Sequence, residues 1–430
     1  FFSKAMNLSI LATILPLGYL LQVAPIQGFV SQQRINRRVA STKNELSGLG
    51  PLQYSIFGRR NNDHVPLSSS SELKFPEYHL HPTKEDSIEL AEGQRLVCIG
   101  DIHGDSKALR SSLELAGLCD ENSAWIGGNS ILVQCGDVLD RGSEELACYS
   151  LLAKLSQEAA KEGGKVICLY GNHEALNAMG LFSYATSDKE YEQEVGPAVD
   201  EAMNTKEWRK QYVGNQPARW AAWEPQGLLA RQLMANMKIA VKVGKTVCVH
   251  AGLTKDHLDK YGGIKSMNRK AKEWITGSSG VKFNNKGEYD TVSEAWVEAE
   301  ARQSTYIDMA PKFLDGGIGS TSPIWMRSYS SPGDQPPTDP KAQSMIDGVL
   351  EALDCDRMVM GHTVQREINC ALQGKAWRVD VGMSRGVVDG TPEVLEIAMQ
   401  DGQEVVSVLN AADGRIEGSE RHIMALVNLF

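Results

Sequence analysis

Three short polar motifs in the sequence are rich in side chains that can bind a metal ion. They are GDIHGD at residues 100–105, GDVLDRG at 136–142 and GNHE at 171–174. Carboxylate oxygens, an amide oxygen and imidazole nitrogens together suit one or two divalent first-row metal ions. Glycines permit sharp turns that bring short side chains to a common point. One such motif could be a capped turn, but three in order along the chain predict a shared metal site.

Two histidines later in the chain also follow apolar runs. His250 lies in the sequence VHAGL, and His362 lies in MGHT. A single histidine at the end of a strand is more often a structural residue than a ligand. A converging metal site needs further nitrogen ligands, however, and both histidines lie where such a site would need one. We therefore count them among the candidate ligands.

Each of the three motifs follows a short, continuously apolar run, at residues 95–100, 131–136 and 165–171. Runs of this kind are typical of buried strands that carry functional loops at their carboxyl ends. Helical patterns at 106–118 and 143–161 separate them. The alternation of strand and helix predicts parallel βαβ units and an α/β fold, in which one edge of the sheet gathers the motifs.

The rest of the chain is predicted to be rich in strands, with two helical insertions. Residues 239–243 and 246–250 predict a hairpin, and further strands are expected at 357–361, 376–381, 394–399 and 404–409. The insertions, near 175–236 and 265–309, would cover the functional edge of the sheet. The first contains Trp208, Trp220 and Trp223. We expect these tryptophans to pack in the core rather than to contact a substrate.

The composition excludes several classes of protein. Of the 430 residues, 42% are hydrophobic and 23% are charged, which excludes a fibrous or largely disordered chain. The net charge of −10 disfavours nucleic acid and anionic membranes as partners. The eight cysteines form no C-x-x-C pair. We expect the four in strand-like runs to be buried thiols rather than disulfides or metal ligands: Cys98, Cys135, Cys168 and Cys248.

The first 71 residues have the composition of a targeting presequence followed by a linker. Residues 1–27 resemble a signal peptide, since the apolar stretch at 8–23 is short for a bilayer and contains Pro16 and Gly18. We expect no stable membrane span in the mature protein. Residues 28–44 are basic and contain no acidic residue, as in a transit peptide, and a polar linker follows to residue 71. Together they predict plastid import by a two-part presequence. The alternative is a secretory signal with a disordered spacer, which would place the protein in the secretory pathway or an endomembrane lumen.

The order of motifs resembles that of the calcineurin-like metallophosphoesterases, specifically the phosphoprotein phosphatase family, over about residues 95–409. The resemblance implies a β-sandwich flanked by helices, with one catalytic domain at 72–411 and a tail at 412–430. It implies two divalent metal ions, which the donor types allow to be Mn, Fe or Zn. The first ion would be held by Asp101, His103 and a bridging Asp137. The second would be held by Asp137, Asn172, His250 and His362.

The same resemblance assigns the remaining catalytic roles. His173 would be the general acid, oriented by Asp140, and Arg141 and Asn172 would bind the substrate phosphate. A second phosphate-binding arginine is expected between the last two histidines, and our candidate is Arg327. The alternative is that Arg327 is a surface residue packed on Trp325.

The implied function is hydrolysis of phosphomonoesters on a phosphorylated protein, by in-line attack of a hydroxide that bridges the metals. Three departures from the common pattern are similar to the Shewanella-like phosphatases: Tyr170 before the third motif, Ala251 after His250, and VDVGMS at 379–384. Members of that branch act on serine and threonine or on tyrosine, so both remain open.

Two other functions stay in view. One is a hydrolase of dinucleoside polyphosphates or other small phosphoesters, because such enzymes share the three motifs. The other is a non-catalytic scaffold on a phosphatase fold. Competent residues fill every expected ligand and acid position, which argues against the scaffold.

Overall fold

The computed structural model describes residues 78–186, 189–203, 209, 212, 216–278, 292–317 and 319–423, apart from the side chains at 202–203, 292–299 and 302. All of these residues belong to one compact unit. The predicted presequence and linker at 1–71 and the last residues of the predicted tail lie outside the described residues.

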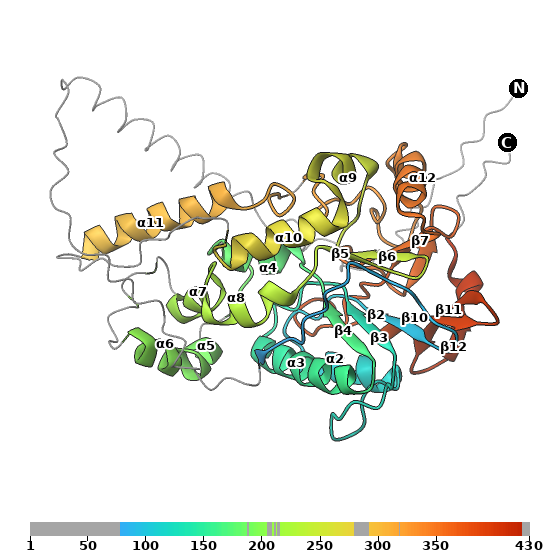
Figure 1. The fold of residues 1–430 in the computed structure, drawn as a ribbon, viewed down its shortest axis with the longest axis horizontal. Helices are drawn as coiled ribbons and strands as arrows, with labels where there is room; N and C mark the ends of the chain where they lie inside the picture. The colour runs from blue at the N-terminus through green and yellow to red at the C-terminus, as the bar shows by residue number, and fades with distance from the viewer. Residues whose placement is uncertain are drawn as a thin grey trace, which may run out of the picture. The chain divides into compact units, whose positions relative to one another are not determined.

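The strands form two six-stranded mixed sheets (Figure 1). Sheet 1 has the order β1-β5-β6-β7-β9-β8, and sheet 2 has the order β12-β11-β10-β2-β3-β4. The strands of sheet 1 are β1 Ser87–Ile88, β5 Ala240–Val243, β6 Thr246–Val249, β7 Arg357–Met360, β8 Asn369–Ala371 and β9 Ala376–Arg378. Those of sheet 2 are β2 Arg95–Ile99, β3 Ile131–Gln134, β4 Lys165–Cys168, β10 Glu393–Gln400, β11 Gln403–Asn410 and β12 Gly414–Glu417.

Sheet 2 contains the predicted βαβ units. Strands β2, β3 and β4 are parallel neighbours, joined through helices α2 (Ser106–Leu115) and α3 (Glu145–Lys161). The carboxylate of Asp105 accepts a hydrogen bond from the N–H of Ala108 and so caps α2. Figure 1 shows α2 and α3 along the sheet that contains β2, β3 and β4. The parallel order confirms the prediction that the three motifs meet at one edge.

Sheet 1 repeats this arrangement on the other side of the core. The predicted hairpin of β5 and β6 is present, and β6, β7 and β9 are parallel neighbours. The sheets meet through their buried faces, where Sγ of Cys98 on β2 lies 3.8 Å from Sγ of Cys248 on β6. The α/β sandwich is therefore confirmed. All eight cysteines are free, and the four for which we expected buried thiols, Cys98, Cys135, Cys168 and Cys248, are indeed buried.

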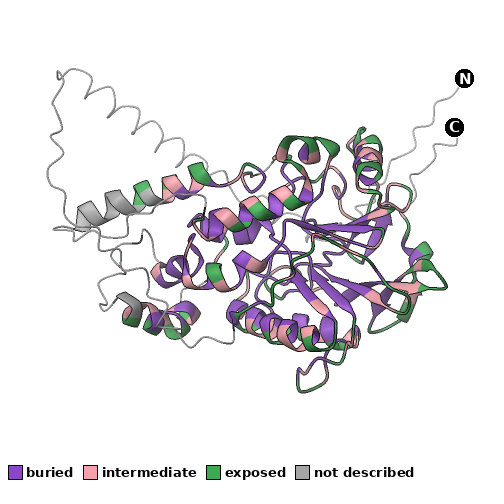
Figure 2. Cartoon of the chain, in the orientation of Figure 1, coloured by how far each residue is buried: buried purple, intermediate pink, exposed green. Residues whose placement is uncertain are grey.

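Helices build both predicted insertions. The first contains α5 Lys189–Glu194, α6 Gly196–Met203, α7 Pro217–Trp223, α8 Leu228–Gln232 and the 3-10 helix η4 Met234–Asn236. The second contains α10 Gly263–Ile275 and α11 Val292–Met309, and the remaining helices are α4 Asn172–Ala178, α9 Lys255–Tyr261, α12 Ala342–Leu353 and the 3-10 helix η5 Gly418–Arg421. Trp220 and Trp223 are fully buried in the first insertion, as expected, whereas Trp208 lies outside the described residues. Figure 2 shows that α3 and α10 each bury one side and expose the other.

The structure changes several predicted boundaries. The third motif does not end a strand in a loop, because Asn172 begins helix α4. Strand β12 lies beyond residue 411, where we expected the tail to start, and it pairs with β11. The short strands β1 and β8 were not predicted at all. Among the described residues, no helix is both long and apolar enough to cross a membrane.

Candidate metal centre

The candidate ligands follow parallel strands of both sheets. Sheet 2 supplies Asp101 and His103 after β2, Asp137 after β3 and Asn172 after β4, while sheet 1 supplies His250 after β6 and His362 after β7. All six side chains are buried. Because the carboxyl ends of parallel strands point to the same edge, each sheet delivers its ligands to the same place. The structure thus brings together residues that are 261 positions apart, as in the contact between Asp101 and His362.

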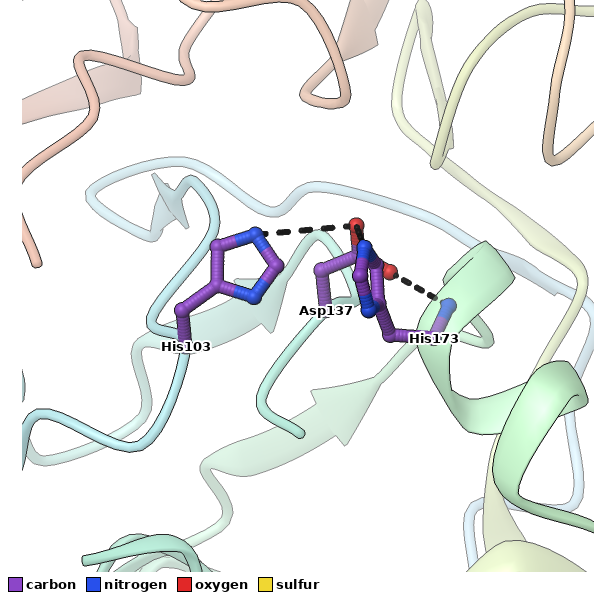
Figure 3. A group of neighbouring side chains, drawn as sticks. All are labelled: His103, Asp137 and His173. Carbon is purple, nitrogen blue, oxygen red and sulfur yellow. Dashed lines mark hydrogen bonds and ion pairs between the residues drawn. The ribbon is translucent and has the colours of Figure 1, made fainter. Parts of the chain in front are cut away.

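Asp137 is the central residue of the site. Its Oδ2 atom lies 3.9 Å from Nε2 of His103, 3.8 Å from Nε2 of His173 and 3.3 Å from Nε2 of His250. Figure 3 shows the imidazoles of His103 and His173 around this carboxylate. Its other oxygen, Oδ1, accepts a hydrogen bond of 3.0 Å from the backbone N–H of His173.

Two clusters of possible metal ligands share Asp137. One consists of His103, Asp137 and His173, and the other of Asp137, His250 and His362, with ligand atoms within 4.8 Å of one another in each. Asn172 extends the second cluster, since its Oδ1 lies 3.1 Å from Nε2 of His250. A carboxylate common to two clusters could bind two metal ions side by side, as a two-metal hydrolase needs.

Hydrogen bonds to the backbone fix which imidazole nitrogen faces the centre. Nδ1 of His103 donates to the carbonyl of Leu139 at 2.9 Å, and Nδ1 of His250 donates to that of Cys135 at 2.8 Å. Both histidines therefore present Nε2 to Asp137. Nε2 of His362 instead donates to the carbonyl of Trp325 at 3.1 Å, which leaves Nδ1 for a ligand. Such outer hydrogen bonds are typical of metal-binding histidines.

Three of the donors have protonation states that fit a metal centre, whereas Asp137 raises the pKa of His250 above its usual value against the effect of burial. Burial lowers the pKa of His103 to about 3 and that of His362 well below its usual range, so both imidazoles are neutral. Burial acts to raise the pKa of Asp137, but His250 and His173 outweigh it and hold that pKa well below its usual range. Neutral imidazoles and an ionised carboxylate are the forms in which these side chains bind metal ions. The residues present therefore fit divalent cations.

The two three-residue clusters leave out Asp101 and include His173. Asp101 belongs to neither three-residue cluster; both of its carboxylate oxygens lie 3.2 Å from the backbone N–H of His362, which donates to them. Burial, followed by repulsion from Asp380 and Asp137, raises the pKa of Asp101 well above its usual range. His173, for which the family resemblance implies the role of general acid, is also a member of the first cluster. Asp101 is still beside the centre, where a cation would relieve the repulsion.

His173 and Asp140 form a buried pair next to the first cluster. Nδ1 of His173 lies 2.6 Å from Oδ2 of Asp140, which leaves Nε2 directed toward Asp137. Burial acts to lower the pKa of His173, but Asp137 and the hydrogen bond to Asp140 raise it above its usual value. This geometry can hold a proton on the side of His173 that faces the centre.

The two predicted phosphate-binding arginines, Arg141 and Arg327, each expose part of the side chain to solvent. The guanidinium of Arg141 lies 5.5 Å from the ring centroid of Tyr184. Nη1 of Arg327 donates to the carbonyl of His362 at 3.1 Å and to Oγ1 of Thr363 at 2.7 Å. Burial of its guanidinium lowers the pKa of Arg327, against the opposing effect of Asp101 and Asp137. Arg327 therefore lies beside the candidate ligands.

The loops of the site have an unusual backbone conformation. Five residues with side chains have φ between 45° and 69°, a region that residues other than glycine rarely adopt: His103, Asp137, Asp140, Arg141 and His362. The carboxylate of Glu174 holds two of these loops, because it accepts hydrogen bonds from the backbone N–H of Gly171, Asp137, Val138 and Leu139. Strained residues persist only where the surrounding structure fixes them, and they cluster at functional sites.

Sequence reasoning missed several residues of the site. Glu174 is part of the third motif but received no role, and Asp380, which follows β9, was quoted only as part of a segment. Burial raises the pKa of Asp380 to about 6, and the charge on Asp137 contributes. Tyr184, whose ring centroid lies 5.0 Å from that of His173, and Arg219, which contacts Asp140, belong to the first insertion. Only the place of Asp380 after a strand could have identified it; the insertion carries no such signal.

Comparisons with known proteins agree with this geometry. The sequence profile of the calcineurin-like phosphoesterases matches residues 94–366. Shewanella-like protein phosphatase 2 of Arabidopsis thaliana is 34% identical over 340 residues, 73% of this chain and 78% of the relative. Shewanella-like protein phosphatase 1 of Plasmodium berghei is 27% identical over 303 residues, 69% of each chain.

Two solved structures share the fold. A point mutant of a cold-active protein tyrosine phosphatase has a TM-score of 0.53 and 18% identity, covering 81% of this chain and 86% of its own. A second structure of a cold-active protein tyrosine phosphatase has a TM-score of 0.52 and 17% identity, covering 81% and 84%. The matched profile and the 34% identical relative agree with a site in which two ligand clusters share Asp137. The chain therefore belongs to the calcineurin-like phosphoesterases, a family of metal-dependent hydrolases, and within them to the Shewanella-like protein phosphatases.

Proposed function

We propose that the protein is a metal-dependent phosphoprotein phosphatase that hydrolyses phosphomonoesters on protein side chains. The observation that carries the proposal is the pair of ligand clusters that share Asp137, next to the buried pair of His173 and Asp140. The names of the relatives support a protein as the substrate.

The proposed centre binds two divalent ions through Asp101, His103, Asp137, Asn172, His250 and His362. When bound, these ions would neutralise charge on the phosphoryl group and lower the pKa of a water molecule enough to supply hydroxide. Imidazole, amide and carboxylate donors suit Mn, Fe or Zn. Elemental analysis of the protein as isolated would identify the metals.

The residues of the chain divide the remaining work. Arg141 and Arg327 hold phosphoryl oxygens by charge-assisted hydrogen bonds, with the amide of Asn172 beside them. An oxygen derived from water bonds to phosphorus as the bond from phosphorus to the leaving oxygen breaks, and the electron pair of the broken bond goes to the leaving oxygen. His173 donates a proton to the same oxygen from Nε2, while Asp140 stays ionised and holds Nδ1.

The decisive experiment compares substrates and a ligand variant. The purified protein, loaded with each metal in turn, is given phosphoserine, phosphothreonine and phosphotyrosine peptides and a diadenosine polyphosphate. We expect the peptides to turn over faster, and Asp137→Asn to lose metal and activity together. Faster turnover of the nucleotide would favour a small-molecule phosphoesterase. A metal-loaded protein that hydrolyses none of them would favour a scaffold.

We further propose that the protein enters a plastid. The support is the sequence of residues 1–44, where an apolar stretch is followed by a basic segment without acidic residues. Residues 1–44 fused to a fluorescent protein should accumulate in plastids. Accumulation in the endomembrane lumen would instead support the secretory alternative.

A further inference from the structure

A buried polar network lies behind the pair of His173 and Asp140. It consists of Asp140, Glu145, Asn177 and Arg219, which we call the Arg219 network. Each of these residues is at most 1% exposed. Buried ions are costly unless they are paired and hydrogen-bonded, so a network of this kind must be closely satisfied.

Arg219 connects the other members of the network. Its Nη2 donates to Oδ1 of Asp140 at 3.0 Å and to Oε1 of Glu145, and its Nε donates to Oδ1 of Asn177 at 2.7 Å. Nδ2 of Asn177 donates to the same Oδ1 of Asp140, also at 3.0 Å. Two donors therefore occupy Oδ1, and Oδ2 is directed to Nδ1 of His173 at 2.6 Å.

This contact pattern fixes the carboxylate of Asp140 in rotation and in charge. Without Arg219, Asp140 and Glu145 would be two buried carboxylates that lack their shared cation. Oδ1 of Asp140 would then keep only the donor from Asn177, and its carboxylate could rotate. Such a rotation would alter the hydrogen bond that orients His173.

Arg219 itself stays away from the reacting atoms. It lies on α7, within the first insertion, 79 residues after Asp140. Its guanidinium carbon lies 4.8 Å from the ring centroid of Tyr191 on α5, and α7 packs against α4, the helix that begins at Asn172. The first insertion thus contacts the site through Asp140, on the side of that carboxylate away from His173.

We propose that Arg219 is a positioning residue that holds Asp140 in the orientation in which His173 can protonate the leaving oxygen. This inference rests on the proposed phosphatase function. It makes the helical insertion part of the general-acid machinery in addition to its place beside the centre.

The proposal predicts an effect that depends on the leaving group. Phenolate from phenyl phosphate is a strong base and needs the proton, whereas 2,4-dinitrophenolate leaves without one. Arg219→Gln should therefore lower kcat for phenyl phosphate by about ten-fold or more, with little change in KM and a much smaller loss for 2,4-dinitrophenyl phosphate. Arg219→Lys, which keeps the charge, should recover part of the loss.

Controls separate this effect from damage to the fold. Metal content and melting temperature are measured for every variant. Arg269→Gln, which removes an exposed guanidinium on α10, should leave both substrates unchanged. If Arg219→Gln does not fold, Asn177→Ala removes the acceptor of Nε and one donor to Asp140. An equal loss on both substrates, or no loss, would overturn the proposal.

A measurement without turnover distinguishes this proposal from the proposed function. The Nδ1 proton of His173 can be followed by NMR in protein that carries ¹⁵N-labelled histidine. In the wild type we expect the resonance of a strongly hydrogen-bonded proton, and in Arg219→Gln a shifted or exchange-broadened one. An unchanged resonance overturns the positioning role. A metal-loaded wild type that hydrolyses neither aryl phosphate overturns the proposed function instead.

Discussion

A Cβ atom at position 171 would overlap Oδ1 of Asp137, so Gly171 is the residue that lets the shared carboxylate occupy its place. The backbone nitrogen of Asp137 also lies too close to that point to leave room for a Cβ. The two loops therefore pack with no room for a side chain between them, and Glu174 holds both by accepting their N–H groups.

Gly171→Ala should displace Asp137 and weaken metal binding by about 10- to 100-fold, as changes to outer-shell partners do. Metal affinity is measured by titration followed by elemental analysis. The control is Gly348→Ala in α12, where a Cβ would meet nothing within 4 Å. That variant should keep its metals and gain up to about 1 kcal/mol of stability from helix propensity. If Gly171→Ala keeps the metal affinity of the wild type, the two loops can separate enough to accept a Cβ, and the prediction is wrong.

His173→Asn should lower kcat by about 10²- to 10⁴-fold, because the leaving oxygen would lose its proton donor. The metal content of the variant distinguishes two roles for His173, the general acid and a metal ligand in the first cluster. Retention of both metals would support the acid. Loss of one metal would make His173 a ligand, and an active variant would contradict both roles.

Arg141→Ala and Arg327→Ala should each lower kcat/KM by about 10- to 100-fold, since a charge-assisted hydrogen bond contributes about 1.5–3 kcal/mol. Inhibition by inorganic phosphate should weaken in parallel, which separates a binding role from a catalytic one. Arg327→Lys should restore the charge but only one of the donor directions. If Arg327→Ala binds phosphate as the wild type does, Arg327 is a structural partner of His362 and Thr363 only.

Stability should depend on pH through Glu190. Burial, followed by repulsion from Glu145 and Glu194, raises the pKa of Glu190 to about 7. The folded protein thus keeps a proton that the unfolded chain releases near the ordinary pKa of glutamate. The contribution of the neutral form to stability is complete below that ordinary pKa and is lost as the pH rises toward 7.

Glu190→Gln removes this loss, because an amide stays neutral and its oxygen can still accept from the N–H of Leu146. Glu190 is only partly buried, so we expect the variant to be more stable by about 1 kcal/mol near pH 8, with little difference near pH 5. Urea unfolding at both pH values measures this. The exposed Glu351→Gln on α12 is the matched control and should show no such difference. A greater gain at low pH would contradict the prediction.

The sequence predicts the parallel strands and the motifs because both depend on local patterns. An apolar run that ends in glycine before a polar motif is a buried strand end, and His362 follows the same rule after Gly361. His250 follows its apolar run directly, without a glycine. The strands β1, β8 and β12 have two to four residues and exist through their partners, which a local pattern does not contain.

The remaining details of the site depend on tertiary packing. Spacing places Asp101 after a strand but does not show that its carboxylate faces the backbone N–H of His362. Arg219 lies in a helix without any motif, and burial among partners 42 to 79 positions away determines its role. For the same reason, the sequence shows Glu174 as part of its motif but does not predict the four backbone N–H groups, from two loops, that its carboxylate accepts.

Because the two sheets contribute ligands to one centre, the stability of the folded sandwich should depend on the concentration of free metal. An ion held by Asp137 and His362 would join sheet 2 to sheet 1 across the core. Ligands that bind only the folded state stabilise it by mass action, by about 4 kcal/mol at a thousand-fold excess over Kd. A cell short of the metal would then hold less of the folded enzyme, because the unfolded fraction is open to proteolysis, and activity would fall through abundance as well as through turnover.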